Sequence, residues 1–149
     1  MGASSSINAN KPPKFHICKP LNYAQMKNIK CMETVLKNYG NYVTTTSDVY
    51  TDSTIQNNIF ESDVIVICIA KSTPRCFYQL KEIDYTARCY KRCIYIMLDH
   101  YYNPNYESWI KSTVKQQPWI SCTQESDVEI VSQFLNREFY NLISNKSDD

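Results

Sequence analysis

A chain of 149 residues, 43% of them hydrophobic, is long enough for one domain with a sizeable core and too short for two ordinary domains. The 16 Lys and Arg nearly balance the 15 Asp and Glu, so no basic face for nucleic acid is predicted. The longest apolar run, residues 64–70, is far shorter than the roughly 20 residues that span a bilayer. We therefore expect a single cytoplasmic domain without a transmembrane segment or a secretory signal, and no nucleic-acid partner.

The first six residues, MGASSS, fit the pattern for N-myristoylation: Gly2 would become the first residue after removal of Met1, and Ser6 stands at the required position. The alternative is an ordinary flexible tail of small residues. Acylated Gly2 would bring the protein to the inner face of the membrane, although a single acyl chain binds membranes only marginally. The expected organisation is a flexible tail over 1–13, a domain over 14–143 and a second flexible tail over 144–149.

Strands and helices are expected to alternate from residue 14 onward. Short segments that are β-branched, aromatic or continuously apolar predict strands at 14–18, 41–46, 63–69, 93–98 and 118–122. Caps and helical periodicity predict helices from Asn22 to Gly40, from Ser53 to about Glu61, from Thr73 to about Arg88, and from Thr123 or Ser126 onward. This alternation predicts an α/β fold with a flavodoxin-like, doubly wound, five-stranded parallel sheet. The strand at 63–69 or the one at 14–18 should be central, because 63–69 is apolar at consecutive positions.

A sheet of this kind binds ligands at the carboxyl ends of its strands. The first two ends carry Cys18 and Lys19, then Ser47 and Asp48. A phosphoacceptor receiver domain would need aspartates after the first and third strands, where Cys18, Lys19 and Lys71 stand instead. A P-loop or dinucleotide fingerprint would need glycines in a phosphate-binding turn, but the chain has only 2 glycines. The sequence therefore excludes both a P-loop and a dinucleotide-binding fingerprint.

The 7 cysteines are an odd number in a chain with no predicted route to an oxidising compartment, so reduced thiols are expected. Cys89 and Cys93 have no matching second pair, and His16 and His100 each stand alone. A closed zinc site needs four ligands. We therefore expect no metal and no bound cofactor.

Two segments resemble Toll/interleukin receptor (TIR) domains: residues 62–72, SDVIVICIAKS, and residues 78–99, YQLKEIDYTARCYKRCIYIMLD. The resemblance covers about residues 14–142. It rests on an apolar third strand that ends in a Ser-containing turn, and on an aromatic residue, Tyr78, four positions before a helix glutamate, Glu82. The stretch EIDYTARCYK is most similar to the NAD-cleaving branch of the family, and KFHICKP places Cys18 and Lys19 where the family's first strand ends.

The resemblance implies a protein of innate immune signalling that hydrolyses NAD, with NAD as substrate. Glu82 would be catalytic and would stabilise the oxocarbenium-like ribose left when nicotinamide departs. The implied substrate-binding residues are Cys18, Lys19, Ser47, Asp48 and Tyr78. In the resembling enzymes, the active site is completed by assembly with other TIR domains.

Two alternatives to this enzyme reading stay open. Glu82 would be an exposed carboxylate near Lys81 and Arg88 if the helix were an ordinary surface helix, and Tyr78 would then serve only in packing. The chain would also fit a non-enzymatic adaptor or decoy, because TIR domains of receptors and adaptors keep the glutamate and act by TIR–TIR association or self-association. The loop after the second strand would take part in that association.

Overall fold

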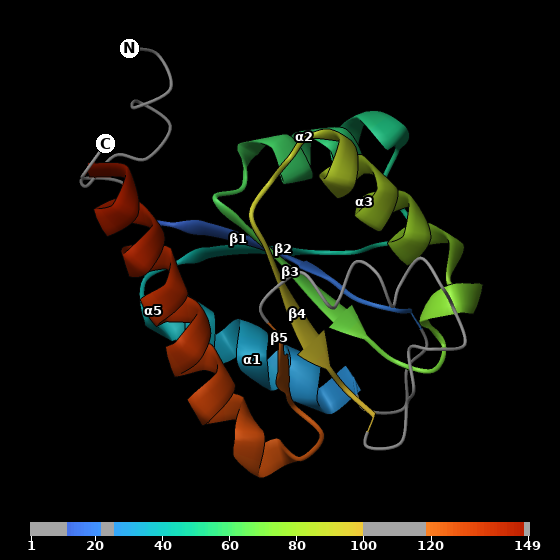
Figure 1. Ribbon diagram of the computed structural model, residues 1–149. Helices are drawn as coiled ribbons and strands as arrows, with labels where there is room; N and C mark the ends of the chain where they lie inside the picture. The colour runs from blue at the N-terminus through green and yellow to red at the C-terminus, as the bar shows by residue number, and fades with distance from the viewer. Residues whose placement is uncertain (1–11, 22–25, 100–118, 148–149) are drawn as a thin grey trace.

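The computed structural model describes residues 12–21, 26–99 and 119–147. Five parallel strands form one sheet in the order β2-β1-β3-β4-β5 (Figure 1). The strands are β1 (Lys14–Cys18), β2 (Tyr42–Thr45), β3 (Val64–Ile69), β4 (Cys93–Met97) and β5 (Trp119–Ser121). This is the predicted doubly wound α/β architecture, and every predicted strand is confirmed within one or two residues at each end.

Two helices cover each face of this sheet. Figure 1 shows α1 (Met26–Asn38) and α5 (Val128–Ser147) together on one face, and α2 (Asp52–Glu61) and α3 (Phe77–Arg88) together on the other. The hydrophobic core is accordingly split into two clusters, one beneath α1 and α5 and one beneath α2 and α3. No helix among the described residues is both long and apolar enough to cross a membrane.

β3 is the middle strand of the sheet, and all six of its residues are buried. A strand with helices on both faces has no solvent-facing side, so its sequence is continuously apolar rather than alternating. β3 pairs with β1 and with β4, and the pairs Ile17 with Val66 and Val66 with Ile94 fix the register across the three strands. The predicted central position of this segment is confirmed.

Side chains along β1 point alternately to the two faces of the sheet, and this alternation decides which of them lie beneath α3. Phe15 and Ile17 belong to the core cluster beneath α1 and α5. Cys18 belongs to the cluster beneath α2 and α3, and His16 shares its face because alternate side chains of a strand point the same way. A polar imidazole therefore lies inside the layer between the sheet and α3, where it is fully buried.

The predicted helix starts need correction. α2 is capped by Thr51, whose hydroxyl accepts a hydrogen bond from the Thr54 N–H, so the expected Ser53 cap is wrong. The expected helix from Thr73 is broken: Thr73–Arg75 form a 3₁₀ turn, and α3 begins only at Phe77. The Thr73 hydroxyl accepts from the Ala70 N–H at the end of β3, and Cys76 is extended, which interrupts the helix.

The last helix also starts differently from the expectation. A 3₁₀ turn at Glu125–Asp127 precedes α5, and its capping box joins Gln124 and Asp127 rather than starting at Thr123 or Ser126. α5 then continues to Ser147, beyond the predicted domain end at 143. Residues 1–11 of the expected tail over 1–13, Gly2 among them, lie outside the described residues, so acylation of Gly2 stays a prediction.

Candidate functional site

The helix α3 turns a mostly polar face toward the sheet. Its buried residues are Gln79, Glu82, Ile83 and Thr86. They follow the helical spacing of a single face, and three of the four are polar. A helix that packs on a sheet usually buries apolar side chains, so this face marks a place where polar groups must find partners inside the protein.

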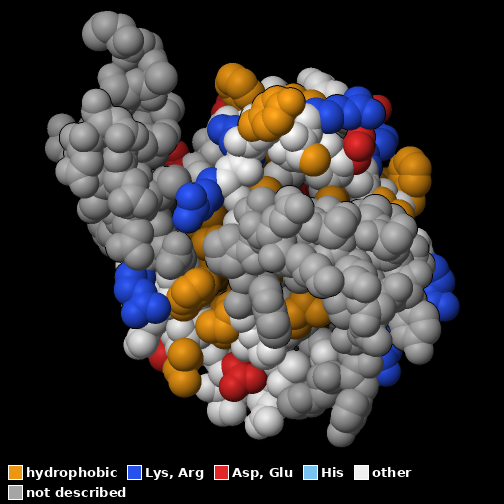
Figure 2. Space-filling model, viewed as in Figure 1, with side chains coloured by type: hydrophobic (Ala, Val, Ile, Leu, Met, Phe, Trp, Pro, Cys, Tyr) orange, Lys and Arg blue, Asp and Glu red, His pale blue; other side chains and the backbone are white. Residues whose placement is uncertain are grey.

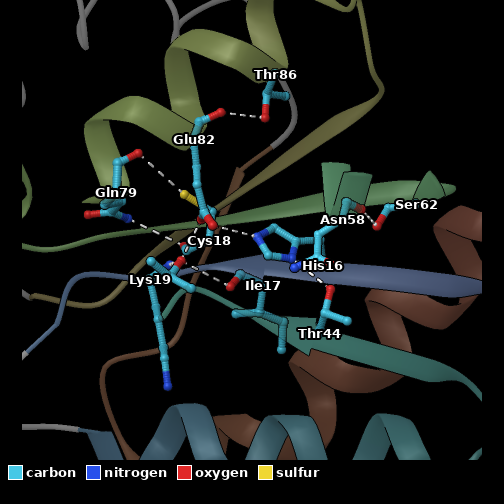
Figure 3. Close-up of polar contacts among 11 residues, drawn as sticks. His16, Ile17, Cys18, Lys19, Thr44, Asn58, Ser62, Gln79, Glu82 and Thr86 are labelled. Atoms are coloured by element: carbon cyan, nitrogen blue, oxygen red, sulfur yellow. Dashed lines mark hydrogen bonds and ion pairs between the residues drawn. The ribbon is translucent and has the colours of Figure 1, made fainter. Parts of the chain in front are cut away.

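Glu82 reaches from α3 to the middle of β1 and to the carboxyl end of β2 (Figure 3). Its Oε1 accepts a hydrogen bond from the Thr46 hydroxyl at 2.5 Å, and its Oε2 lies 3.1 Å from Nε2 of His16. Glu82 has no exposed surface. The alternative that Glu82 is a solvated surface carboxylate is therefore wrong: the side chain is enclosed and bound to its own protein.

His16 links Glu82 to the edge strand. Its Nδ1 lies 2.7 Å from the Thr44 hydroxyl on β2, while its Nε2 faces Glu82. Neither Nε2 of His16 nor Oε2 of Glu82 makes a well-aligned hydrogen bond with a described residue, so their contact is electrostatic. An unprotonated Nε2 and an ionised Oε2 at this distance would repel each other, because each would present a lone pair to the other.

Thr46 links Glu82 to the backbone just after β1. Its hydroxyl donates to Glu82 and accepts a hydrogen bond from the backbone N–H of Lys19 at 2.9 Å. The backbone of Lys19 is thus part of the Glu82 surroundings, but its side chain is not. In Figure 3 this side chain extends away from Glu82, as the alternation along β1 requires. Lys19 is brought to the site by its backbone only.

Gln79 bridges the adjacent strands β1 and β3. Its side-chain amide donates to the backbone carbonyls of Cys18 at 3.3 Å and Cys68 at 2.6 Å. The Cys18 thiol in turn donates to the Gln79 carbonyl at 3.7 Å. Burial, reinforced by the nearby Glu82 charge, raises the pKa of the Cys18 thiol well above its usual range. The thiol therefore stays protonated and is no nucleophile at neutral pH.

The remaining predicted site residues lie around this cluster. Ser47 and Asp48 follow β2, where the Ser47 hydroxyl accepts from the Val49 N–H and Asp48 is exposed. Tyr78 is half-buried on α3 and makes an edge-to-face contact with Phe77, with ring centres 5.7 Å apart. The structure thus brings Cys18 close to Glu82 and places Ser47 and Asp48 next to Thr46.

Four residues of the cluster were not predicted from the sequence: His16, Thr44, Thr46 and Gln79. No local motif marks them, and their signal is only their spacing along one helix face and one face of the sheet. Glu82 and Gln79 are three positions apart on one helix, and residues 16, 44 and 46 occupy inward-facing positions on two adjacent strands. Within the described ranges, no group of three or more His, Cys, Asp or Glu side chains is placed to hold a metal ion.

A separate groove of about 730 Å³ lies on the other side of α3. It runs between α3 and β4 and is lined mainly by apolar side chains, among them Ile83 and Tyr95. Glu82 is absent from its described lining. The buried carboxylate and this groove are therefore different features of the molecule.

Scans of the sequence against protein-family models and against curated proteins give no match. Solved structures do match the fold. The TIR domain of the Toll-related receptor TRR-2 from Hydra magnipapillata has a TM-score of 0.64 and 11% identity, and the match covers 85% of this chain and 97% of the other. The TIR domains of the activated Roq1 resistosome, which recognises the pathogen effector XopQ, give 0.65 and 11%, with 85% and 98% covered.

A third similar structure is the CMP N-glycosidase BcmB from Clostridium botulinum, with a TM-score of 0.59, 15% identity, and 81% of this chain and 98% of that chain covered. Identities this low show the fold alone. The chain has the fold of TIR domains, and the fold implied by the sequence resemblance is confirmed.

Proposed function

We propose that this chain is a TIR-type signalling module that cleaves the N-glycosidic bond between nicotinamide and ribose in NAD, with Glu82 as the catalytic residue. One observation carries the proposal: the Glu82 carboxylate is held between His16 in the middle of β1 and Thr46, which directly follows the carboxyl end of β2. In sheets of this topology, the carboxyl ends of the strands are where ligands bind. Burial of a carboxylate is costly unless it is paired, so its place in the interior calls for a reason.

The main requirement of this reaction on the protein is a negative charge in a fixed position. Departure of nicotinamide leaves an oxocarbenium-like ribose, and a preorganised carboxylate stabilises that cation without having to reorient. Water then completes the hydrolysis to an ADP-ribose product. Ser47 and Asp48 would line the mouth of the site, and Tyr78 would pack beside the sugar or base. The Cys18 thiol, which stays protonated, takes no covalent part.

A likeness of fold to an N-glycosidase is consistent with this reaction type. BcmB is by name an enzyme that cleaves the N-glycosidic bond of CMP. That bond, like the one in NAD, joins a ribose carbon to a ring nitrogen of a base, and its cleavage develops the same kind of positive charge.

Access to Glu82 requires a change of state, because the carboxylate is fully enclosed. We propose that association with further TIR folds, in self-assembly or with a partner, supplies this change. Two structural neighbours are assemblies by their own description, the Roq1 resistosome and the heterodimer of the RPS4 and RRS1 TIR domains. The heterodimer gives a TM-score of 0.56 at 11% identity, over 86% of this chain and 96% of that chain.

A non-enzymatic adaptor or decoy is the second candidate, and surface aromatic residues favour it. Phe60, Phe77 and Tyr90, on or just after α2 and α3, are 67%, 64% and 94% exposed. Figure 2 shows hydrophobic side chains beside Lys and Arg over these two helices. Lys91 lies 5.4 Å from the centre of the Phe60 ring, and Lys81 lies 5.0 Å from that of Phe77. Exposed aromatic side chains of this kind commonly anchor protein–protein contacts.

The concentration dependence of turnover tests the proposed function. Purified full-length protein should release nicotinamide from NAD, and the turnover per molecule should rise as the protein is concentrated, because assembly completes the site. A protein without turnover even when concentrated or crowded would reject the enzyme. If that protein still bound a TIR domain and lost the binding on Asp48→Lys in the loop after β2, the adaptor would be the right function.

Acylation of Gly2 belongs to the same proposal and would place the module at the inner face of a membrane. Gly2→Ala removes the glycine that the myristoylation motif requires at the acylated position, so the protein should move from the membrane fraction to the soluble fraction. An unchanged distribution, or an intact mass without an acyl chain, would remove the anchor from the proposal and leave the rest standing.

A further inference from the structure

We propose that His16 is the positioning residue of Glu82: it holds the carboxylate in place and supplies the proton that allows its burial. The inference rests on the proposed function for its catalytic consequence, but the position of the proton is a property of the chain itself. His16 does not reach the expected place of the substrate, because it lies in the middle of β1 beneath α3.

The geometry leaves His16 a single role in the cluster. Its ring is fully buried between Thr44 on one side and Glu82 on the other, at 2.7 Å and 3.1 Å. Each ring nitrogen thereby faces a polar group, and the ring lies between the edge strand β2 and the helix α3 (Figure 3). A histidine whose two ring nitrogens both face polar neighbours has a defined orientation, and those neighbours decide which nitrogen carries the proton.

The charge of Glu82 needs such a partner. Among its described contacts, the Thr46 hydroxyl is neutral and stabilises the carboxylate only by hydrogen bonding. The Lys19 side chain extends away from the cluster (Figure 3). The Cys18 thiol also lies close to Glu82, but it donates to the backbone carbonyl of Gln79 and is neutral when protonated. Among these described neighbours, His16 is thus the one that can place a full positive charge next to Oε2. Without it, a buried carboxylate would either take up a proton or leave its enclosed position.

Two neighbouring groups hold the carboxylate from two directions, Thr46 by a hydrogen bond and His16 by an electrostatic contact. Thr46 holds Oε1 from the end of β2, and His16 holds Oε2 from β1. Loss of His16 leaves only Oε1 fixed, so the carboxylate would rotate about its last side-chain bond. Misplacement of a catalytic group by about 1 Å lowers turnover by up to about a hundredfold. The main effect should fall on kcat rather than on KM, because His16 does not touch the substrate.

Imidazole NMR tests the inference directly, because the chain has only 2 histidines. In protein labelled with ¹⁵N-histidine and carrying His100→Gln, the one remaining imidazole is that of His16. We expect a protonated Nε2 whose signal shifts on Glu82→Gln and is unchanged on Glu33→Gln, a substitution on the opposite face of the sheet. A signal that is the same with and without Glu82→Gln, or a proton on Nδ1 alone, overturns the inference.

Two substitutions of His16 test the inference by their effect on enzyme activity. Gln offers an amide N–H near the place of Nε2, whereas Leu fills the space without a donor. His16→Leu should lower kcat about tenfold to a hundredfold with little change in KM, and His16→Gln should restore part of that loss. Equal kcat values for wild type and His16→Leu, both shown to be folded by circular dichroism, overturn the positioning role. If wild type has no turnover, the proposed function fails, while the NMR result still decides where the proton lies.

Discussion

Glu82→Gln is expected to lower the rate of nicotinamide release from NAD by about a hundredfold or more, the effect of losing one preorganised electrostatic group. The amide has nearly the shape of the carboxylate, and its oxygen can still accept the hydrogen bond from Thr46. The change therefore removes the negative charge while keeping most of the packing. Initial rates at saturating NAD, measured at the protein concentration where wild type is most active, give the comparison.

Glu33→Gln is the matched control for this measurement. Glu33 lies on α1, on the face of the sheet opposite Glu82, and forms a surface ion pair with Lys37 at 2.9 Å. Its loss should leave turnover unchanged. Turnover that survives Glu82→Gln would show that the catalytic group lies elsewhere, and Glu82 would then be a structural residue of the α3 interface.

The fold was predictable because hydrophobic patterning and topology both act on many residues at once. β3 was predictable because a strand with helices on both faces is apolar throughout, and the edge strand β2 because its residues are aromatic or β-branched. Helix starts were less predictable because a cap depends on a single hydroxyl. Thr51 and Ser53 are both good N-cap residues, and only the position of the Thr54 N–H decides between them.

One residue of the candidate site, Glu82, was predictable from the sequence, but the residues that surround it were not. Glu82 stood out through the family resemblance, but the sequence could not tell a buried carboxylate from an exposed one. The deciding partner, His16, is 66 residues away, and a lone histidine in an apolar strand has no local signal for its role. The pairing appears only when strand alternation and the sheet order are combined, which places residues 16 and 44 side by side on the face covered by α3.

Replacement of His16 alone, or of Glu82 alone, is expected to destabilise the protein far more than replacement of both residues together. Glu82→Met leaves the imidazole without an acceptor, and His16→Leu leaves a buried carboxylate oxygen without a donor. Removal of one partner of a buried pair costs about 3–5 kcal/mol, whereas replacement of both by apolar residues of similar volume is often close to neutral. The double variant should therefore be at least as stable as either single variant. Urea unfolding of the four proteins gives the free energies.

An exposed pair provides the reference for this double-mutant cycle. Lys37 and Glu33 are four residues apart on α1, so their coupling in the same assay should be only about 0.3–0.5 kcal/mol. A coupling of that small size between His16 and Glu82 would contradict the buried pair. A large coupling together with a full loss of turnover in Glu82→Gln would mean that one carboxylate both holds α3 on the sheet and carries the reaction. The enclosed state would then be the resting state, in which His16 and Thr46 already hold the carboxylate in position and assembly opens the site to the substrate.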